Sequence, residues 1–139
     1  MKKQLLEEHE ESLMKNNRFR ELLGIQIKEV VEGRAILELP FNENLLQSAN
    51  MLHGGVLSIL VDSVIGTAIR SVLNEKTIAI TAEMNINYFR PAMKGTLRAE
   101  GKVLNKGNTI AVGTANIYEE DGKIVATGRA TYVVKKMPV

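Results

Sequence analysis

Asp62 has the clearest potential for chemistry in this 139-residue chain, because it lies inside the longest apolar stretch, residues 54–73 (GGVLSILVDSVIGTAIRSVL). A buried carboxylate is costly unless it is paired, hydrogen-bonded or facing water. Residues 58–66 contain no Lys or Arg, so the usual partner three or four positions away is missing. Asp62 also lies about two turns from the start of the segment, too far for a capping role. It is therefore either a catalytic or ligand-facing carboxylate, or a residue with a structural partner elsewhere in the fold.

The tripeptide His53-Gly54-Gly55 opens the same apolar segment. Two glycines at a helix N-terminus leave backbone N–H groups unshielded at the positive end of the helix dipole. Such groups can bind an oxyanion or polarise a carbonyl. The alternative interpretation is a tight turn into the helix, with His53 acting only as its cap.

Composition excludes several other kinds of site. The chain has no cysteine, which excludes disulfides, cysteine-ligated zinc, iron–sulfur clusters and a thiol nucleophile. The two histidines, His9 and His53, are too few for a histidine-rich metal site. We therefore expect neither a metal nor another cofactor.

Charge and hydropathy argue against binding to nucleic acid or membrane. The net charge is +2 and only 4% of the residues are aromatic. The sequence has no apolar run long enough to span a bilayer, and its first residues are too polar for a signal peptide, so we expect a cytoplasmic location. Basic residues are nevertheless concentrated in residues 90–139, which have 9 basic and 4 acidic side chains. This excess would suit a phosphorylated ligand or a solvated face.

Hydrophobic periodicity predicts one long buried helix over residues 54–73, because its apolar positions cover most of a helical wheel. Residues 2–17 have the pattern of a short amphipathic helix, and residues 1–23 form a helical extension of a single domain, 1–139. Residues 41–53 lack a period and are rich in asparagine, which predicts a loop.

The remaining segments have the alternation and turn signals of strands. Six strands are predicted, over residues 25–31, 34–39, 77–88, 95–104, 109–118 and 123–134. In the third, six side chains alternate with polar residues and are predicted to share one face. They are Ile78, Ile80, Ala82, Met84, Ile86 and Tyr88.

These elements predict an α+β fold in which a curved antiparallel sheet of about six strands wraps around one long central helix. One helix cannot cover such a sheet completely. We therefore expect another copy of the chain to cover the remaining sheet surface and edges, giving a homo-oligomer.

The segment from Leu52 through His53-Gly54-Gly55 to Asp62, followed by NINYFRPA, resembles the hotdog-fold acyl-CoA thioesterases of the PaaI type, in the thioesterase superfamily. The resemblance extends from about Gly24 to Val134, with both motifs in the expected order. It implies the hotdog fold and hydrolysis of an acyl-CoA thioester to free acid and CoA, without a metal.

Carried over residue by residue, the resemblance implies that Asp62 is the catalytic carboxylate, acting as nucleophile or as general base on a water. The Gly54 N–H would hold the thioester carbonyl oxygen, and His53 would position that end of the substrate. Gln47 stands where relatives carry Asn or Gln, and Thr81 where they carry a Ser or Thr that orients the attacking water. The alternatives are a loop residue for Gln47 and an ordinary strand residue for Thr81.

The resemblance also implies positions that bind the nucleotide or pantetheine arm of CoA. These are Gly55, Tyr88, Phe89, Arg90, Pro91, Lys94, Lys106, Gly107, Asn108 and Lys135, with Lys136 a weaker candidate. The acyl pocket is expected to depend on Leu45, Leu46, Met51 and Ile59, whose apolar character does not identify the acyl group.

Helix geometry adds an argument that is independent of the resemblance. Gly54 and Asp62 are eight residues apart, about 12 Å along a helix axis. Both can act on one thioester carbon only if they come from different subunits, with two helices antiparallel across a two-fold axis. This predicts a homodimer with shared active sites. With the thioesterase function that the resemblance implies, we expect a homotetramer built as a dimer of such dimers.

Two other functions remain open on the same fold. A non-catalytic acyl-CoA-binding regulator would use an added DNA-binding segment, for which the roughly 23 residues before the first strand are too few. It would also have no use for Asp62. A hydratase or dehydratase would need an Asp/His pair near the acyl α and β carbons, which fits the spacing of His53 and Asp62 less well.

Overall fold

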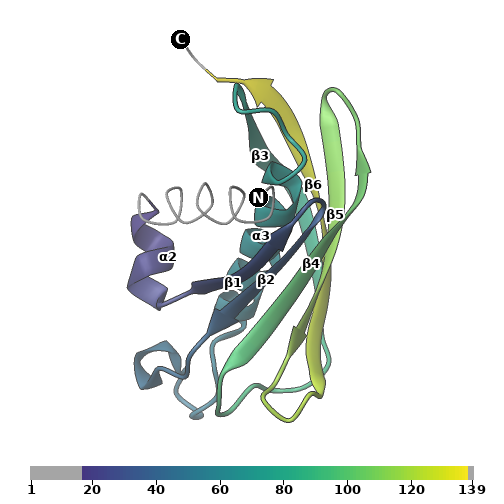
Figure 1. Cartoon of the computed structure of the whole chain (residues 1–139). Helices are drawn as coiled ribbons and strands as arrows, with labels where there is room; N and C mark the ends of the chain where they lie inside the picture. The colour runs from purple at the N-terminus through teal and green to yellow at the C-terminus, as the bar shows by residue number, and fades with distance from the viewer. Residues whose placement is uncertain (1–16, 138–139) are drawn as a thin grey trace.

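The computed structural model describes residues 17–137, which form a six-stranded sheet packed against one long helix (Figure 1). The helix, α3, spans Gly54–Arg70. The strands are β1 (Gln26–Val31), β2 (Arg34–Leu39), β3 (Thr77–Tyr88), β4 (Leu97–Lys106), β5 (Ile110–Tyr118) and β6 (Ile124–Lys136). Two short helices precede α3, namely α2 (Arg18–Leu23) and the 3₁₀ helix η1 (Glu43–Leu45).

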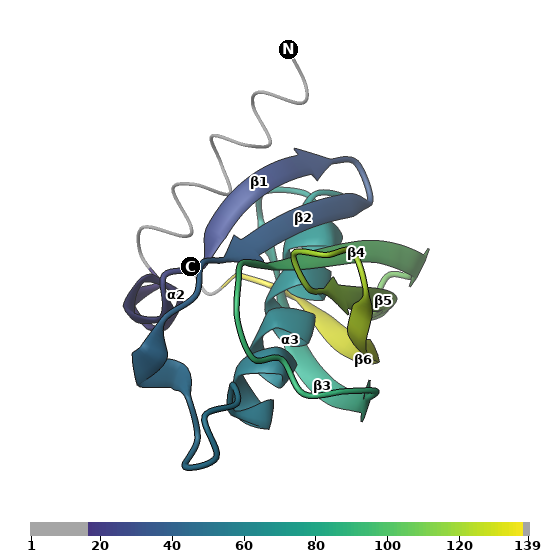
Figure 2. The same cartoon turned by 90° about the horizontal axis from the view of Figure 1, so that it is seen from below.

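The strand order is β1-β2-β4-β5-β6-β3, and every neighbouring pair is antiparallel. Figure 2 shows the sheet curving around α3, so that the helix occupies its concave face. β1 and β3 are the two edge strands. The predicted α+β arrangement of six strands around one central helix is confirmed.

The core is built between the inner face of the sheet and the buried side of α3. Leu60, Val64 and Ile65 of the helix are fully buried, because this side of α3 faces the sheet. From the strands, Leu37, Leu97, Ile117 and Val125 are also fully buried. The prediction of a long buried helix is therefore confirmed over Gly54–Arg70.

Small residues on the sheet allow α3 to approach it closely. Paired residues form one row across four strands, consisting of Ala35, Gly101, Ala115 and Gly128. A Cβ added at Gly101 would lie 2.8 Å from the carbonyl oxygen of Val64, and one added at Gly128 would overlap Cγ1 of Val61. These glycines are needed because larger side chains would push the helix off the sheet.

The end of α3 differs from the prediction, which extended the helix to residue 73. The helix ends at Arg70. The N–H group of Ser71 still bonds four residues back, to Thr67, whereas those of Val72 and Leu73 bond to carbonyls only three residues back. Ser71 explains the change, because its hydroxyl donates to the Ala68 carbonyl and accepts from Gly33 N–H at 2.8 Å. This bond ties the helix end to the β1–β2 turn.

The prediction of which β3 side chains face the core is wrong for the first half of the strand. A bulge between Thr81 and Glu83 adds one residue to β3 relative to β6. An extra residue reverses the alternation, so Ala79 packs against the core while Ile80 is 48% exposed. After the bulge, Met84 and Ile86 pack inward as predicted.

The other strand boundaries agree with prediction to within two residues. The predicted helix over residues 2–17 lies, apart from Asn17, outside the described residues. Hydrophobic periodicity did not predict α2 as a separate helix. Asn17 caps its N-terminus by accepting a hydrogen bond from Arg20 N–H, and Gly24 caps its C-terminus with a φ of 81°. Among residues 17–137, no helix is both long and apolar enough to cross a membrane.

Candidate active site

The carboxylate of Asp62 lies on α3 where the helix faces β3 and β6. The Thr81 hydroxyl donates to its Oδ1 at 2.7 Å, and the Tyr132 hydroxyl lies 2.5 Å from the same oxygen. Tyr132 Oη also lies 2.6 Å from the Asp62 backbone carbonyl oxygen. Asp62 is half-buried, and it is held by hydroxyls of two adjacent strands rather than by an ion pair.

Tyr132 is a site residue that the sequence analysis missed. It lies directly opposite Thr81 in the register of β3 and β6, and it is 3% exposed. Burial, the hydrogen bond to Asp62 and the nearby negative charge raise the pKa of Tyr132 far above its usual value. The phenol therefore stays protonated and acts as a donor to Asp62.

The N-terminus of α3 presents one available backbone donor. Gly55 N–H donates to Nδ1 of His53 at 3.1 Å, and Val56 N–H donates to the His53 carbonyl at 2.9 Å. Gly54 N–H, by contrast, has no acceptor within the described chain. His53 is thus the helix cap, as in the structural alternative, and it leaves Gly54 as the donor that could bind a carbonyl oxygen.

Tyr88, on β3, contacts the same N-terminal end of α3. Its hydroxyl donates to the Gly54 carbonyl at 3.0 Å, and a Cβ added at Gly54 would lie 3.5 Å from its ring. Tyr88 and Phe89 are 50% and 55% exposed. Tyr88, the last residue of β3, therefore lies beside the Gly54 donor, and Phe89 directly follows it with a largely exposed side chain.

Gln47 caps its own loop in the described chain. Its side-chain oxygen accepts from Ala49 N–H, and its backbone N–H donates to the Met51 carbonyl at 2.7 Å. The loop is joined to the start of α3, because His53 N–H donates to the Leu45 carbonyl at 3.0 Å. Of the four residues expected to shape the acyl pocket, Leu45, Leu46 and Ile59 pack against the core, and Met51 is half-buried.

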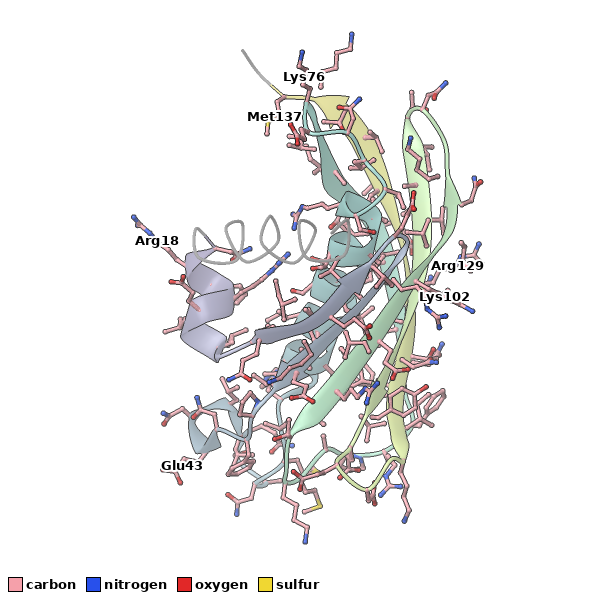
Figure 3. The ribbon with its side chains drawn as sticks, in the orientation of Figure 1. Arg18, Glu43, Lys76, Lys102, Arg129 and Met137 are labelled. Carbon is pink, nitrogen blue, oxygen red and sulfur yellow. The ribbon has the colours of Figure 1, made fainter. Side chains whose placement is uncertain are left out.

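The residues expected to bind CoA lie at two opposite ends of the sheet. Arg90, Pro91 and Lys94 follow β3 at the Gly54 end, where Arg90 forms an ion pair with Glu119 at 3.2 Å. The turn Lys106-Gly107-Asn108 and Lys135 lie at the other end, near Lys76 and Met137 in Figure 3.

Part of the basic excess lies away from the site altogether. Figure 3 shows Lys102 and Arg129 on the outer face of the sheet, the face opposite to α3. A cavity of about 530 Å³ lies on that outer face and is lined by residues of β1, β2, β4 and β5. Neither Asp62 nor Gly54 lines it, since both lie on the helix side of the sheet.

No group of three or more His, Cys, Asp or Glu side chains with a metal-binding arrangement occurs in residues 17–137. The groups that the described residues bring to Asp62 are two hydroxyls, those of Thr81 and Tyr132, and the helix N-terminus lies at the other end of α3.

The two halves of this site do not meet in one chain. Gly54 and Asp62 lie on one continuous helix, about 12 Å apart along its axis. On β3, Thr81 contacts Asp62 and Tyr88 contacts Gly54. β3 is an edge strand of the described sheet, so one of its sides pairs with no other described strand. A second copy paired along this edge could bring unlike halves together.

Comparison with known proteins gives the class of the fold and site. Residues 49–126 match the model of the thioesterase superfamily, and they include His53, Gly54, Asp62 and Thr81. The chain belongs to this superfamily.

Individual relatives agree with this assignment. The chain is 31% identical to a Saccharolobus solfataricus protein named as an esterase, over 94% of this chain and 92% of that one. It is 30% identical to acyl-coenzyme A thioesterase 13 of Pongo abelii, over 92% and 93%. The E. coli PaaI structure shares its fold, with a TM-score of 0.88 and 24% identity over 99% of this chain and 97% of that one. The protein is thus a hotdog-fold thioester hydrolase of the thioesterase superfamily.

Proposed function

We propose that this protein hydrolyses an acyl-CoA thioester to the free acid and CoA, with Asp62 as the acting carboxylate. The observation that carries the proposal is the Asp62 carboxylate, which is held by two hydroxyls on the half-buried face of α3 beside an open sheet edge. The name of the Pongo abelii relative supports CoA thioesters as the substrate class.

The active site is proposed to form between two subunits whose β3 edges pair antiparallel. The bulge adds one residue between Thr81 and Glu83, so Thr81 and Tyr88 lie three pairing positions on either side of Asn85. A two-fold axis through Asn85 therefore places Thr81 opposite the partner's Tyr88. With them, Asp62 of one subunit comes beside the partner's Gly54.

Antiparallel pairing also accounts for the two separate sets of basic residues. Arg90 and Lys94 lie at one end of the sheet, and Lys106 and Lys135 at the other. In the proposed dimer, Arg90 and Lys94 of one subunit lie at the same end as Lys106 and Lys135 of the partner subunit. The phosphates of CoA would bind there, and two such dimers would make the proposed tetramer.

In the proposed mechanism, Gly54 N–H donates to the thioester carbonyl oxygen and stabilises the negative charge that develops on it. Asp62 of the other subunit either removes a proton from water as the water attacks the carbonyl carbon, or attacks that carbon itself. The tetrahedral intermediate collapses and breaks the carbon–sulfur bond, and the thiolate takes up a proton to give CoA. In the second route, water then hydrolyses the acyl–Asp62 anhydride and regenerates the carboxylate.

The first test measures free-thiol release from a panel of aryl and aliphatic acyl-CoA substrates. Asp62→Asn and Asp62→Ala are expected to lower kcat by about 10²–10⁴-fold, which is the usual contribution of a general base. Asp121→Asn is the matched control, since Asp121 is the other aspartate of the chain and lies in the β5–β6 turn. Tight acyl-CoA binding without turnover would instead favour the binding regulator, and turnover that survives in both Asp62 variants would refute the role of Asp62.

A single-turnover reaction in ¹⁸O-labelled water separates the two routes. With enzyme in excess, attack by water puts ¹⁸O into the acid product at the first turnover. Attack by Asp62, followed by attack of water on Cγ of the acyl–Asp62 anhydride, gives an unlabelled acid first and leaves ¹⁸O in the carboxylate. Label in the peptide containing Asp62, detected by mass spectrometry, therefore identifies this route.

A further inference from the structure

The two oxygens of the Asp62 carboxylate have different surroundings. Oδ1 lies within hydrogen-bond distance of both Thr81 Oγ1, at 2.7 Å, and Tyr132 Oη, at 2.5 Å. Oδ2 accepts no hydrogen bond from any described residue. A carboxylate held through one oxygen has its plane and its second oxygen fixed in direction.

The two hydroxyls are placed by the sheet and not by the helix that carries Asp62. Thr81 and Tyr132 are opposite each other on β3 and β6, so one cross-strand pair supplies both. The Tyr132 ring crosses α3 at Gly66, where an added Cβ would lie 3.4 Å from the hydroxyl. The small residue at position 66 gives the phenol room to reach Asp62, which lies one helical turn earlier.

We propose that Tyr132 is a positioning residue that, together with Thr81, fixes Oδ1 of Asp62 and leaves Oδ2 as the oxygen that acts on water or on the thioester. This inference rests on the proposed function, because it assigns the reacting oxygen of the same carboxylate. It gives β6, through the contact of Tyr132 with Asp62, a defined part in the reaction.

The electrostatic surroundings agree with this role. The charged groups that act on the Tyr132 hydroxyl are Asp62 and Arg70, both on α3. Burial and the Asp62 carboxylate keep the pKa of Tyr132 high despite the opposing effect of Arg70. The phenol therefore remains a neutral donor over the range in which a carboxylate is ionised.

The kinetic test compares Tyr132→Phe with Tyr118→Phe, a control whose hydroxyl contacts Asn116 and lies outside the site. Tyr132→Phe is expected to lower kcat by about 10- to 100-fold, the range for a slightly misplaced reacting group, with KM nearly unchanged. Equal kinetics in the two variants would overturn the proposal.

A spectroscopic test does not depend on turnover. The chain has two aspartates, so ¹³Cγ-aspartate labelling of an Asp121→Asn background reports Asp62 alone. The chemical shift of that signal, measured at one fixed pH, should change in Tyr132→Phe and in Thr81→Val, because each variant removes a hydroxyl that contacts Oδ1. An unchanged signal in folded Tyr132→Phe protein would overturn the proposal.

A further measurement covers the case in which Tyr132→Phe fails to fold. Incorporation of 3-fluorotyrosine keeps every hydroxyl and makes each phenol a stronger donor. The ¹³Cγ signal of Asp62 should therefore move in the direction opposite to its movement in Thr81→Val, and an unchanged signal would overturn the proposal. The proposed function fails separately, if Asp62→Asn retains the kcat of the Asp121→Asn control.

Discussion

Replacing Gly128 with alanine should destabilise the protein, although alanine is the more favourable residue in an unconstrained strand by about 0.5–1 kcal/mol. Gly128 lies on the inner face of β6, where α3 crosses the sheet. The added Cβ would overlap Cγ1 of Val61 and lie 3.2 Å from its Cγ2 and 3.0 Å from the Asn85 carbonyl oxygen. The lack of space thus predicts the opposite sign from intrinsic strand preference.

The size of the effect follows from ordinary packing distances. Carbon atoms pack about 3.5–4.0 Å apart, so α3 must move by roughly 1 Å or Val61 must leave its rotamer. Overpacking of this kind costs about 1–3 kcal/mol. An unfolding entropy of about 2.1 cal/mol/K per residue makes each kcal/mol worth about 3 °C in this chain. We therefore expect Tm to fall by about 3–10 °C.

The assay is thermal and urea unfolding at one fixed protein concentration, arranged as two double-mutant cycles. Val61→Ala removes the overlapping methyl groups, so it should recover at least about 1 kcal/mol of the Gly128→Ala loss. The matched cycle combines Gly101→Ala with Val64→Ala. The Cβ added at Gly101 would lie 2.8 Å from the backbone oxygen of Val64, and Val64→Ala does not remove that oxygen. That pair should couple more weakly.

The same substitution should affect activity, because Asp62 follows Val61 on α3. Well below Tm, kcat should fall in Gly128→Ala and recover in the double variant with Val61→Ala. The reasoning is refuted if Gly128→Ala is as stable as the wild type, or if the two cycles show equal coupling.

Two further predictions concern the β3 edge and Tyr132. In the proposed dimer Asn85 faces its own copy, so Asn85→Cys should form an intersubunit disulfide under mild oxidation, visible on a non-reducing gel in this cysteine-free chain. Glu83→Cys or Asn87→Cys should cross-link far less, and equal cross-linking at all three positions would contradict the register. The folded state raises the pKa of Tyr132, so the neutral phenol contributes to the free energy of unfolding. This contribution is complete below about pH 10, the usual pKa of tyrosine. Above that pH it falls by up to about 1.4 kcal/mol per pH unit. The stability difference between wild type and Tyr132→Phe, measured by urea unfolding from pH 9 to 11, should therefore narrow above pH 10; a constant difference would argue against the buried phenol.

The sequence by itself predicted the elements whose signals are local. The apolar residues of α3 repeat with the period of a helix, and turn residues separate six alternating segments, so helix, strands and their order followed from neighbouring positions. Asp62 stood out for the same reason, since its lack of a nearby cation is visible within one helical turn on either side. His53-Gly54-Gly55 was likewise recognisable as the start of the helix.

Features that depend on the pairing of distant segments were decided by the tertiary structure. The bulge at Thr81 appears only in the register with β6, and it reversed the predicted face of Ile78 and Ile80. Tyr132 is 70 residues from Asp62, and nothing in the neighbouring sequence links the two. The pairing of Tyr132 with Thr81 between β6 and β3 places its hydroxyl beside Oδ1 of Asp62. Periodicity describes which way a side chain points from its own strand, whereas a hydrogen bond across the core depends on the register between strands and on how closely the helix approaches them.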